Sequence, residues 1–176
     1  MLAAFAAPAH ATEGIEVQQA HLEQTDDGHI LSASFVFELN HGLEEALIGG
    51  LPLQFTTTVE LMRPRWYWFN ENTVEVSQTV RLSYNVLTRQ YRAAIDGGLQ
   101  QNFSTLNDAL AMIRRPTRWV VAPKGKLKPG ELYNCTVQLK LDLNQLPKPF
   151  QVNALNNSDW RFSSDKKHFV YKVEEK

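Results

Sequence analysis

The segment between positions 63 and 92 holds the residues best suited to molecular recognition, because arginines and aromatic residues are concentrated there. Five arginines against two glutamates leave it with a net charge of +3. Arginine and aromatic side chains dominate binding hot spots, and a guanidinium can hold a carboxylate or a phosphate through two parallel hydrogen bonds. The segment therefore predicts a recognition surface, whose binding residues are Arg63, Arg65, Trp66, Trp68, Arg81, Arg89 and Arg92. The alternative is structural, with aromatic rings filling the core and arginine stems covering its edge.

Residue types that carry catalysis or bind metals are present but scattered. The chain has no G-x-S-x-G motif, Gly-rich phosphate loop, H-E-x-x-H or C-x-x-C. The histidines beyond residue 11 lack metal-ligand spacing: His21, His29, His41 and His168. Glu44 and Glu45 are adjacent on an expected helix, so their carboxylates do not face each other. We therefore expect no catalytic residue, no metal site and no cofactor, and we expect that the protein is not an enzyme.

For two residues near position 130, Tyr133 and Cys135, the sequence predicts structural roles. Residues 127–133 resemble the tyrosine corner of immunoglobulin-like and fibronectin type III domains, where the tyrosine hydroxyl hydrogen-bonds to the upstream backbone. Tyr133 would be that tyrosine. Cys135, the only cysteine, lies two residues later and has no partner for a disulfide within the chain. A single cysteine in an alternating strand pattern is usually a small buried apolar residue.

The composition is that of a folded protein, with 43% hydrophobic and 21% charged residues. A length of 176 residues favours one domain. The net charge of −1 argues against a general nucleic-acid binder, which needs an excess of lysine and arginine. No apolar run reaches the roughly 18–20 residues of a transmembrane helix.

The first eleven residues differ from the rest of the chain. They are rich in alanine, carry no Lys, Arg, Asp or Glu, and end in Ala9-His10-Ala11. This small-x-small ending is typical of signal-peptidase sites. We interpret residues 1–11 as the remnant of a secretory signal peptide, which predicts a periplasmic or secreted mature chain. The alternative is a disordered alanine-rich terminus.

Alternating apolar residues predict many short strands. We expect a hairpin of residues 15–24 and 30–39 around a turn at 25–29, then strands at 53–62, 73–84, 90–95, 119–122, 133–143, 160–162 and 169–173. Asn40 is expected to cap a short helix that Gly49 ends, and Ser104 a second one before Pro116. Residues 146–150 read as a proline-rich turn. The pattern predicts a mainly β domain over residues 12–176, an antiparallel immunoglobulin or fibronectin III-like β-sandwich with two short helices.

Several segments together resemble a bacterial family called DUF4390, a domain of unknown function. They are residues 43–55, 63–68, 81–92 and 146–152, with the segment around Trp160, and the likeness covers nearly all of the mature chain. The resemblance implies an exported protein and no established activity. It also implies a gene neighbourhood that includes a membrane sensor histidine kinase of the nitrogen-regulation type.

The functional expectation is an exported, non-catalytic interaction domain. Its partner would be an envelope protein, and the gene neighbourhood favours an accessory role to a two-component sensor histidine kinase. The second hypothesis is a module that binds a small ligand or an envelope glycan through the Arg/aromatic segment, with Trp66 and Trp68 as stacking platforms. The third is an enzyme of unrecognised type, which would need clustered polar residues in a deep pocket.

Overall fold

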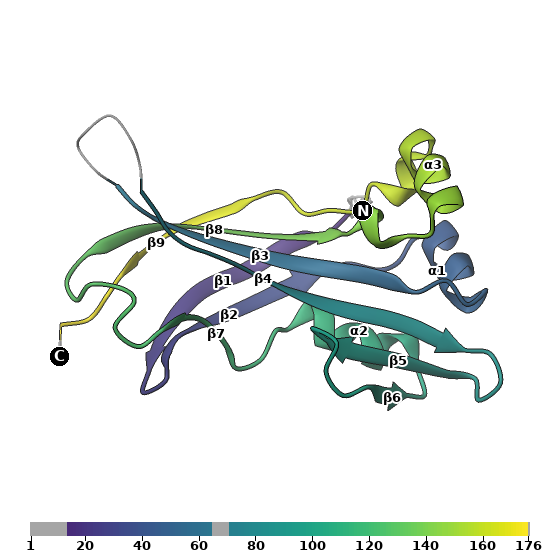
Figure 1. Cartoon of the computed structure of the whole chain (residues 1–176), viewed down its shortest axis with the longest axis horizontal. Coiled ribbons are helices and arrows are strands. Elements are labelled where there is room, and N and C mark those ends of the chain that lie inside the picture. Colours follow the sequence, from purple (N-terminus) through teal and green to yellow (C-terminus); the bar gives the residue numbers. More distant parts are fainter. Residues whose placement is uncertain (1–13, 65–70, 176) are drawn as a thin grey trace, which may run out of the picture.

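A computed structural model of the chain describes residues 14–64 and 71–175, and the interpreted signal remnant, residues 1–11, lies outside them. The described residues form two antiparallel sheets and three α-helices (Figure 1). The strands are β1 Glu16–Thr25, β2 Gly28–Val36, β3 Leu53–Arg63, β4 Glu71–Asn85, β5 Gln90–Ile95, β6 Gln101–Phe103, β7 Trp119–Pro123, β8 Leu132–Leu141 and β9 Lys167–Lys172. The mainly β, antiparallel class expected from the sequence is confirmed.

The small sheet has the order β1-β2-β7 and begins with the expected hairpin. A two-residue turn joins the strands, with Thr25 paired to Gly28. Gly28 has a positive φ of 139°, and a Cβ atom there would collide with the carbonyl oxygen of Ala122 on β7. Glycine is therefore required at this position, because it admits this backbone conformation and lets β7 approach.

The large sheet has the order β6-β5-β4-β3-β8-β9 and turns one face toward the small sheet. Alternate residues of β3 are buried, and Val59 and Leu61 pair with Val137 and Cys135 of β8. The residues between them form the opposite, outer face. In Figure 1, β3 and β4 pass in front of β1 and β2, and no helix crosses in front of them. The outer face of this sheet is therefore a polar surface beside a core that both sheets share.

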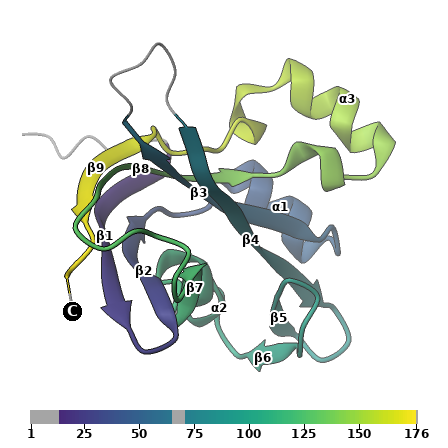
Figure 2. The ribbon, with the colours of Figure 1, turned by 60° about the vertical axis from the view of Figure 1, so that its left-hand side comes forward.

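Helix α1, His41–Ile48, begins where the sequence predicts it. The side chain of Asn40 accepts a hydrogen bond from the backbone N–H of Leu43 at 3.0 Å. Helix α2, Leu106–Arg114, is capped by Thr105 and not by Ser104, because the Thr105 hydroxyl accepts from the N–H of Asp108 at 3.2 Å. Both helices bury apolar residues in the core, and Figure 2 shows α2 beside β7.

The expectation of only two helices is wrong. A third, α3, spans Lys148–Asn156, where the sequence predicts a proline-rich turn. Pro147 is its N-cap and Pro149 lies in its first turn. Proline is compatible with these positions because the first N–H groups of a helix have no intrahelical acceptor. The two prolines therefore mark the beginning of a helix.

Two predicted strand segments also differ. Residues 158–160 form a 3-10 turn, η2 (Ser158–Trp160), because the Asn157 side chain accepts from the N–H of Asp159 at 3.0 Å. Strand β8 ends at Leu141 and not at Leu143, which starts another 3-10 turn, η1 (Leu143–Gln145). Short polar side chains that bond to nearby backbone groups compete with strand pairing at both places.

Aromatic rings join the two sheets at the core. Phe37, from the connection after β2, stacks on Phe55 of β3 with ring centroids 5.9 Å apart. Phe162, which follows η2, meets Phe37 edge-on at 5.7 Å. The three rings are at most 6% exposed. Burial of each such ring contributes roughly 2–3 kcal/mol to stability.

The hydrogen bond expected of Tyr133 is present, and it yields a first prediction. The backbone N–H of Lys128 donates to the Tyr133 hydroxyl at 3.0 Å, and the Tyr133 ring is 1% exposed. Tyr133→Phe should lower the free energy of unfolding by about 1–2 kcal/mol, because the N–H loses its acceptor. Urea denaturation measures this change. Tyr91→Phe is the control, because no hydrogen bond to the Tyr91 hydroxyl is found among the described residues; equal losses in the two variants would refute the role of the bond.

Candidate functional site

The predicted Arg/aromatic segment is spread along the length of the large sheet. Arg63 ends β3 and pairs with Glu71 at the start of β4, whereas Arg89 lies in the turn that follows β4. Strand β4 has 15 residues. At about 3.4 Å per residue, Arg63 and Arg89 are roughly 45 Å apart. They do not belong to one patch. Arg65, Trp66 and Trp68 lie outside the described residues.

Arg81 and Arg92 are the two predicted site residues that the structure brings together. Val80 and Leu82 of β4 are buried, and Arg81 between them is exposed on the outer face. Because Arg81 pairs with Ala94 and Ser83 with Arg92, the two arginines are diagonal neighbours on this face. The Nε atom of Arg92 is buried and has no hydrogen-bond partner among the described residues. We call this surface the arginine face.

A polar pocket of about 440 Å³ adjoins the arginine face and includes Arg81 in its wall. Other polar side chains of the wall are Gln54, Thr79, Asp96, Gln100, Asp142 and Gln145. Asp96 has a positive φ of 47°, and its carboxylate accepts from the N–H of Thr79 at 2.8 Å. That bond fixes the loop after β5 against β4. The pocket can donate and accept hydrogen bonds but has no aromatic wall among the described residues.

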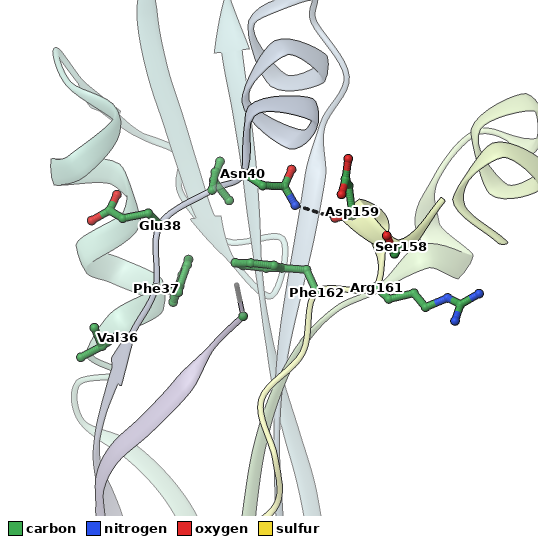
Figure 3. Close-up of a pocket in the computed structure, with 10 residues that line it drawn as sticks. Val36, Phe37, Glu38, Asn40, Ser158, Asp159, Arg161 and Phe162 are labelled. Atoms are coloured by element: carbon green, nitrogen blue, oxygen red, sulfur yellow. Dashed lines mark hydrogen bonds between the residues drawn. The ribbon is translucent and has the colours of Figure 1, made fainter. Parts of the chain in front are cut away.

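A larger pocket of about 650 Å³ lies where the connection after β2 meets the segment around η2 (Figure 3). We call it the junction pocket. Its deeper wall includes Phe37 and Phe162, and its rim carries Glu38, Asp159 and Arg161. In Figure 3 the Arg161 side chain points away from Phe37 and Phe162. The volume falls in the range of small-ligand sites.

Asn40 ties the two walls of the junction pocket together. Its Oδ1 caps α1, while its Nδ2 donates to the carbonyl oxygen of Asp159 at 2.6 Å (Figure 3). The sequence identified Asn40 only as a helix cap. The partner residue lies 119 positions away, so no local pattern could have indicated this pocket.

Arg114 of α2 supports the same region from the other side. Its Nε and Nη2 donate to the carbonyl oxygen of Phe37 at 3.1 and 2.6 Å, and Nη2 lies 3.0 Å from a carboxylate oxygen of Glu38. The guanidinium carbon also lies 5.3 Å from the centroid of the Phe37 ring. These contacts fix the backbone at Phe37 and Glu38, which form one wall of the junction pocket.

The potentially reactive side chains are separated and engaged in local contacts. Within residues 14–64 and 71–175 no three His, Cys, Asp or Glu residues are grouped as metal ligands. Cys135 is 1% exposed, and burial raises the pKa of its thiol to about 12. The histidines have different neighbours: His21 contacts Glu23, His29 contacts Tyr171, His41 contacts Glu45, and His168 contacts Thr136.

His29 makes stability depend on pH. It is 3% exposed, its Nδ1 lies 2.8 Å from the Tyr171 hydroxyl, and burial lowers its pKa below 6.5. The unfolded chain therefore takes up a proton near pH 6.5 that the folded chain resists. The stability that neutral His29 contributes is present above that pH and is lost as the pH falls below it.

We accordingly predict that the free energy of unfolding falls between pH 7.5 and 5.5, and that His29→Gln makes this fall shallower. Urea midpoints across the range measure it. His41→Gln, at an 87% exposed side chain, should leave the slope unchanged. An identical slope for the wild type and His29→Gln would show that other groups cause the pH dependence.

Comparisons with known proteins give one match. The model of the family described as "Domain of unknown function (DUF4390)" matches residues 12–170. Neither the curated proteins nor the solved structures give a match. Among the described residues, no helix has the length and apolar character to cross a membrane.

Proposed function

The chain belongs to the DUF4390 family, a domain of unknown function, and from that premise we propose that it is an exported interaction domain without catalytic activity. Its partner is an envelope protein, and the sensor region of a two-component histidine kinase is the first one to test. The alanine-rich residues 1–11 and the gene neighbourhood of related chains support this proposal. The family has no known activity, so the side chains of the structure are the basis for proposing a contact site.

The observation that carries the proposal is the arginine face. Arg81 and Arg92 are diagonal neighbours on an outer sheet face, and the buried Nε of Arg92 lacks a hydrogen-bond partner among the described residues. A buried donor without an acceptor costs free energy, and the exposed side chain of Arg81 beside it is open to a partner. A carboxylate from a partner protein can bond to a guanidinium through two N–H groups. The arginine face is therefore suited to an acidic surface.

The state of the reactive groups supports binding over catalysis. A thiol with a pKa of about 12 holds almost no thiolate at neutral pH, and the thiolate is the nucleophile. His29, whose pKa burial lowers, lies in the core beside Tyr171 and away from both pockets. The pocket walls contain arginines, amides and carboxylates that can hold a partner.

The test is direct binding to the purified extracytoplasmic region of a two-component sensor histidine kinase. Arg81→Ala with Arg92→Ala should weaken binding roughly tenfold or more, because truncating one member of an interfacial charge pair leaves the other unpaired. Arg115→Ala, at the exposed arginine that follows α2, is the matched control. Circular dichroism checks the fold, and Arg81→Ala alone serves if the double variant unfolds. Unchanged affinity in a folded variant would refute the proposal.

A second candidate, binding of a small ligand or envelope glycan, is favoured by the polar pocket. Arg81, Asp96 and Gln54 in its wall offer donors and acceptors for the hydroxyl groups of such a ligand. Calorimetric titration with peptidoglycan fragments tests it. Gln100→Ala changes only this pocket's wall, so it should weaken glycan binding and leave kinase binding intact. No heat with any fragment would remove this candidate.

We also propose that the two sheets are a variant of the immunoglobulin or fibronectin type III sandwich. The bond from Lys128 N–H to the Tyr133 hydroxyl supports this relation, because such domains have the same corner. The strand order in sheets of three and six strands departs from the usual seven-stranded arrangement. An experimental structure that superimposes on neither kind of domain would refute it.

A further inference from the structure

Large apolar side chains are exposed at one end of the molecule. There α3, the end of α1 and the turn between β4 and β5 all lie at the same end of the long axis, with α1 between α3 and the turn (Figure 1). The exposed residues of this end are Ile48, Val86, Leu87, Phe150, Val152 and Leu155. Leu87 is 94% exposed and Leu155 is 69% exposed. Several large apolar side chains exposed at one end of a molecule indicate an interaction site more often than a single one does.

Local hydrogen bonds hold these apolar residues out of the core. In the turn after β4, Oδ1 of Asn85 accepts from the N–H groups of Leu87 and Thr88 at 3.0 and 3.2 Å. Beside α3, Nε2 of Gln151 donates to the carbonyl oxygen of Leu146 at 2.7 Å. Both segments are therefore fixed in a shape that presents their apolar side chains to the outside. We call residues 85–90 and α3 the apolar tips.

The charges of the apolar tips are positive. Residues 85–90 include Arg89, α3 begins at Lys148, and neither segment contains an acidic residue. Arg161 lies close to α3, since its Nη2 donates to the carbonyl oxygen of Leu155 at 3.2 Å. Helix α1, between the two tips, carries Glu44, which is half-buried, and Glu45, which lies 3.1 Å from Nε2 of His41.

We propose that the apolar tips dock on the surface of a membrane that contains anionic lipids. Exposed leucine, valine and phenylalanine enter the boundary between headgroups and acyl chains, and nearby arginine and lysine contact the lipid phosphates. This combination fits a lipid surface better than a second copy of the chain, because a two-fold contact would bring like charges together. The inference concerns a different surface from the arginine face and does not depend on it.

Sedimentation with vesicles tests the proposal. We expect the protein to bind vesicles of phosphatidylcholine and phosphatidylglycerol in equal parts, to bind pure phosphatidylcholine vesicles less, and to be released by salt. Leu87→Ser with Leu155→Ser should weaken binding about tenfold, because two apolar side chains no longer enter the lipid. Arg89→Gln should weaken binding and reduce its dependence on salt.

Leu99→Ser is the matched control, because Leu99 is 92% exposed in the loop between β5 and β6, which is not an apolar tip. It should bind vesicles as the wild type does. Failure of the wild type to sediment with anionic vesicles at low salt would overturn the proposal, as would equal losses for Leu99→Ser. Self-association that Leu87→Ser abolishes would assign the surface to a second copy instead.

Discussion

Arg114→Ala is expected to lower the free energy of unfolding by about 3 kcal/mol. The substitution removes two hydrogen bonds to the carbonyl oxygen of Phe37, the ion pair with Glu38 and the contact of the guanidinium with the Phe37 ring. It also leaves the carbonyl oxygen of Phe37, a residue only 4% exposed, without the donors that Arg114 supplies. Urea denaturation at neutral pH measures the loss.

Two other variants make this prediction specific. Arg114→Lys keeps a positive charge beside Glu38 but cannot donate twice to one carbonyl or stack as a plane, so we expect it to restore only part of the stability. Arg115→Ala, at the exposed neighbouring position, should change stability by less than about 0.5 kcal/mol. If Arg114→Ala is no more destabilising than Arg115→Ala, the contacts of Arg114 with Phe37 do not stabilise the fold.

Native protein is expected to react with a disulfide reagent at pH 8 about a thousandfold more slowly than protein unfolded in urea. Burial raises the pKa of the Cys135 thiol from 9.0 to about 12. Each pKa unit above the working pH lowers the thiolate population about tenfold, and the thiolate is the reacting species. Release of thionitrobenzoate from Ellman's reagent measures both rates. Comparable rates would mean that Cys135 is accessible and reactive in the folded protein, and would support a role for it as a catalytic nucleophile.

Strands with one buried face, such as β3 and β8, could be predicted from the sequence, whereas β6, which has no buried residue, was not predicted. The alternation in β3 and β8 survives in the structure as rows of paired apolar residues such as Val59 and Val137. Asn40 and Tyr133 were also predictable, since each acts through a hydrogen bond to a backbone group within five residues. Helix α3 was missed because proline signals both a turn and a helix start.

The candidate sites were less predictable because they depend on distant segments. Nearness in sequence suggested one surface for Arg63 and Arg89, but a 15-residue strand separates them. Strand pairing then brings Arg81 next to Arg92, a relation that depends on the register of β4 and β5. The junction pocket lies between two segments, around Asn40 and Asp159, that are 119 positions apart in the sequence. Neither segment contains a motif that predicts a pocket.

Hydrogen exchange on the protein with its partner bound tests the central claim most directly. The partner can be the kinase sensor region or a protein captured by the tagged chain from envelope extracts. We predict slower amide exchange in β4 and β5 around Arg81 and Arg92, and no such change in the Arg81→Ala, Arg92→Ala variant. Protection confined to the β1-β2-β7 sheet would contradict the assignment of the contact to the arginine face.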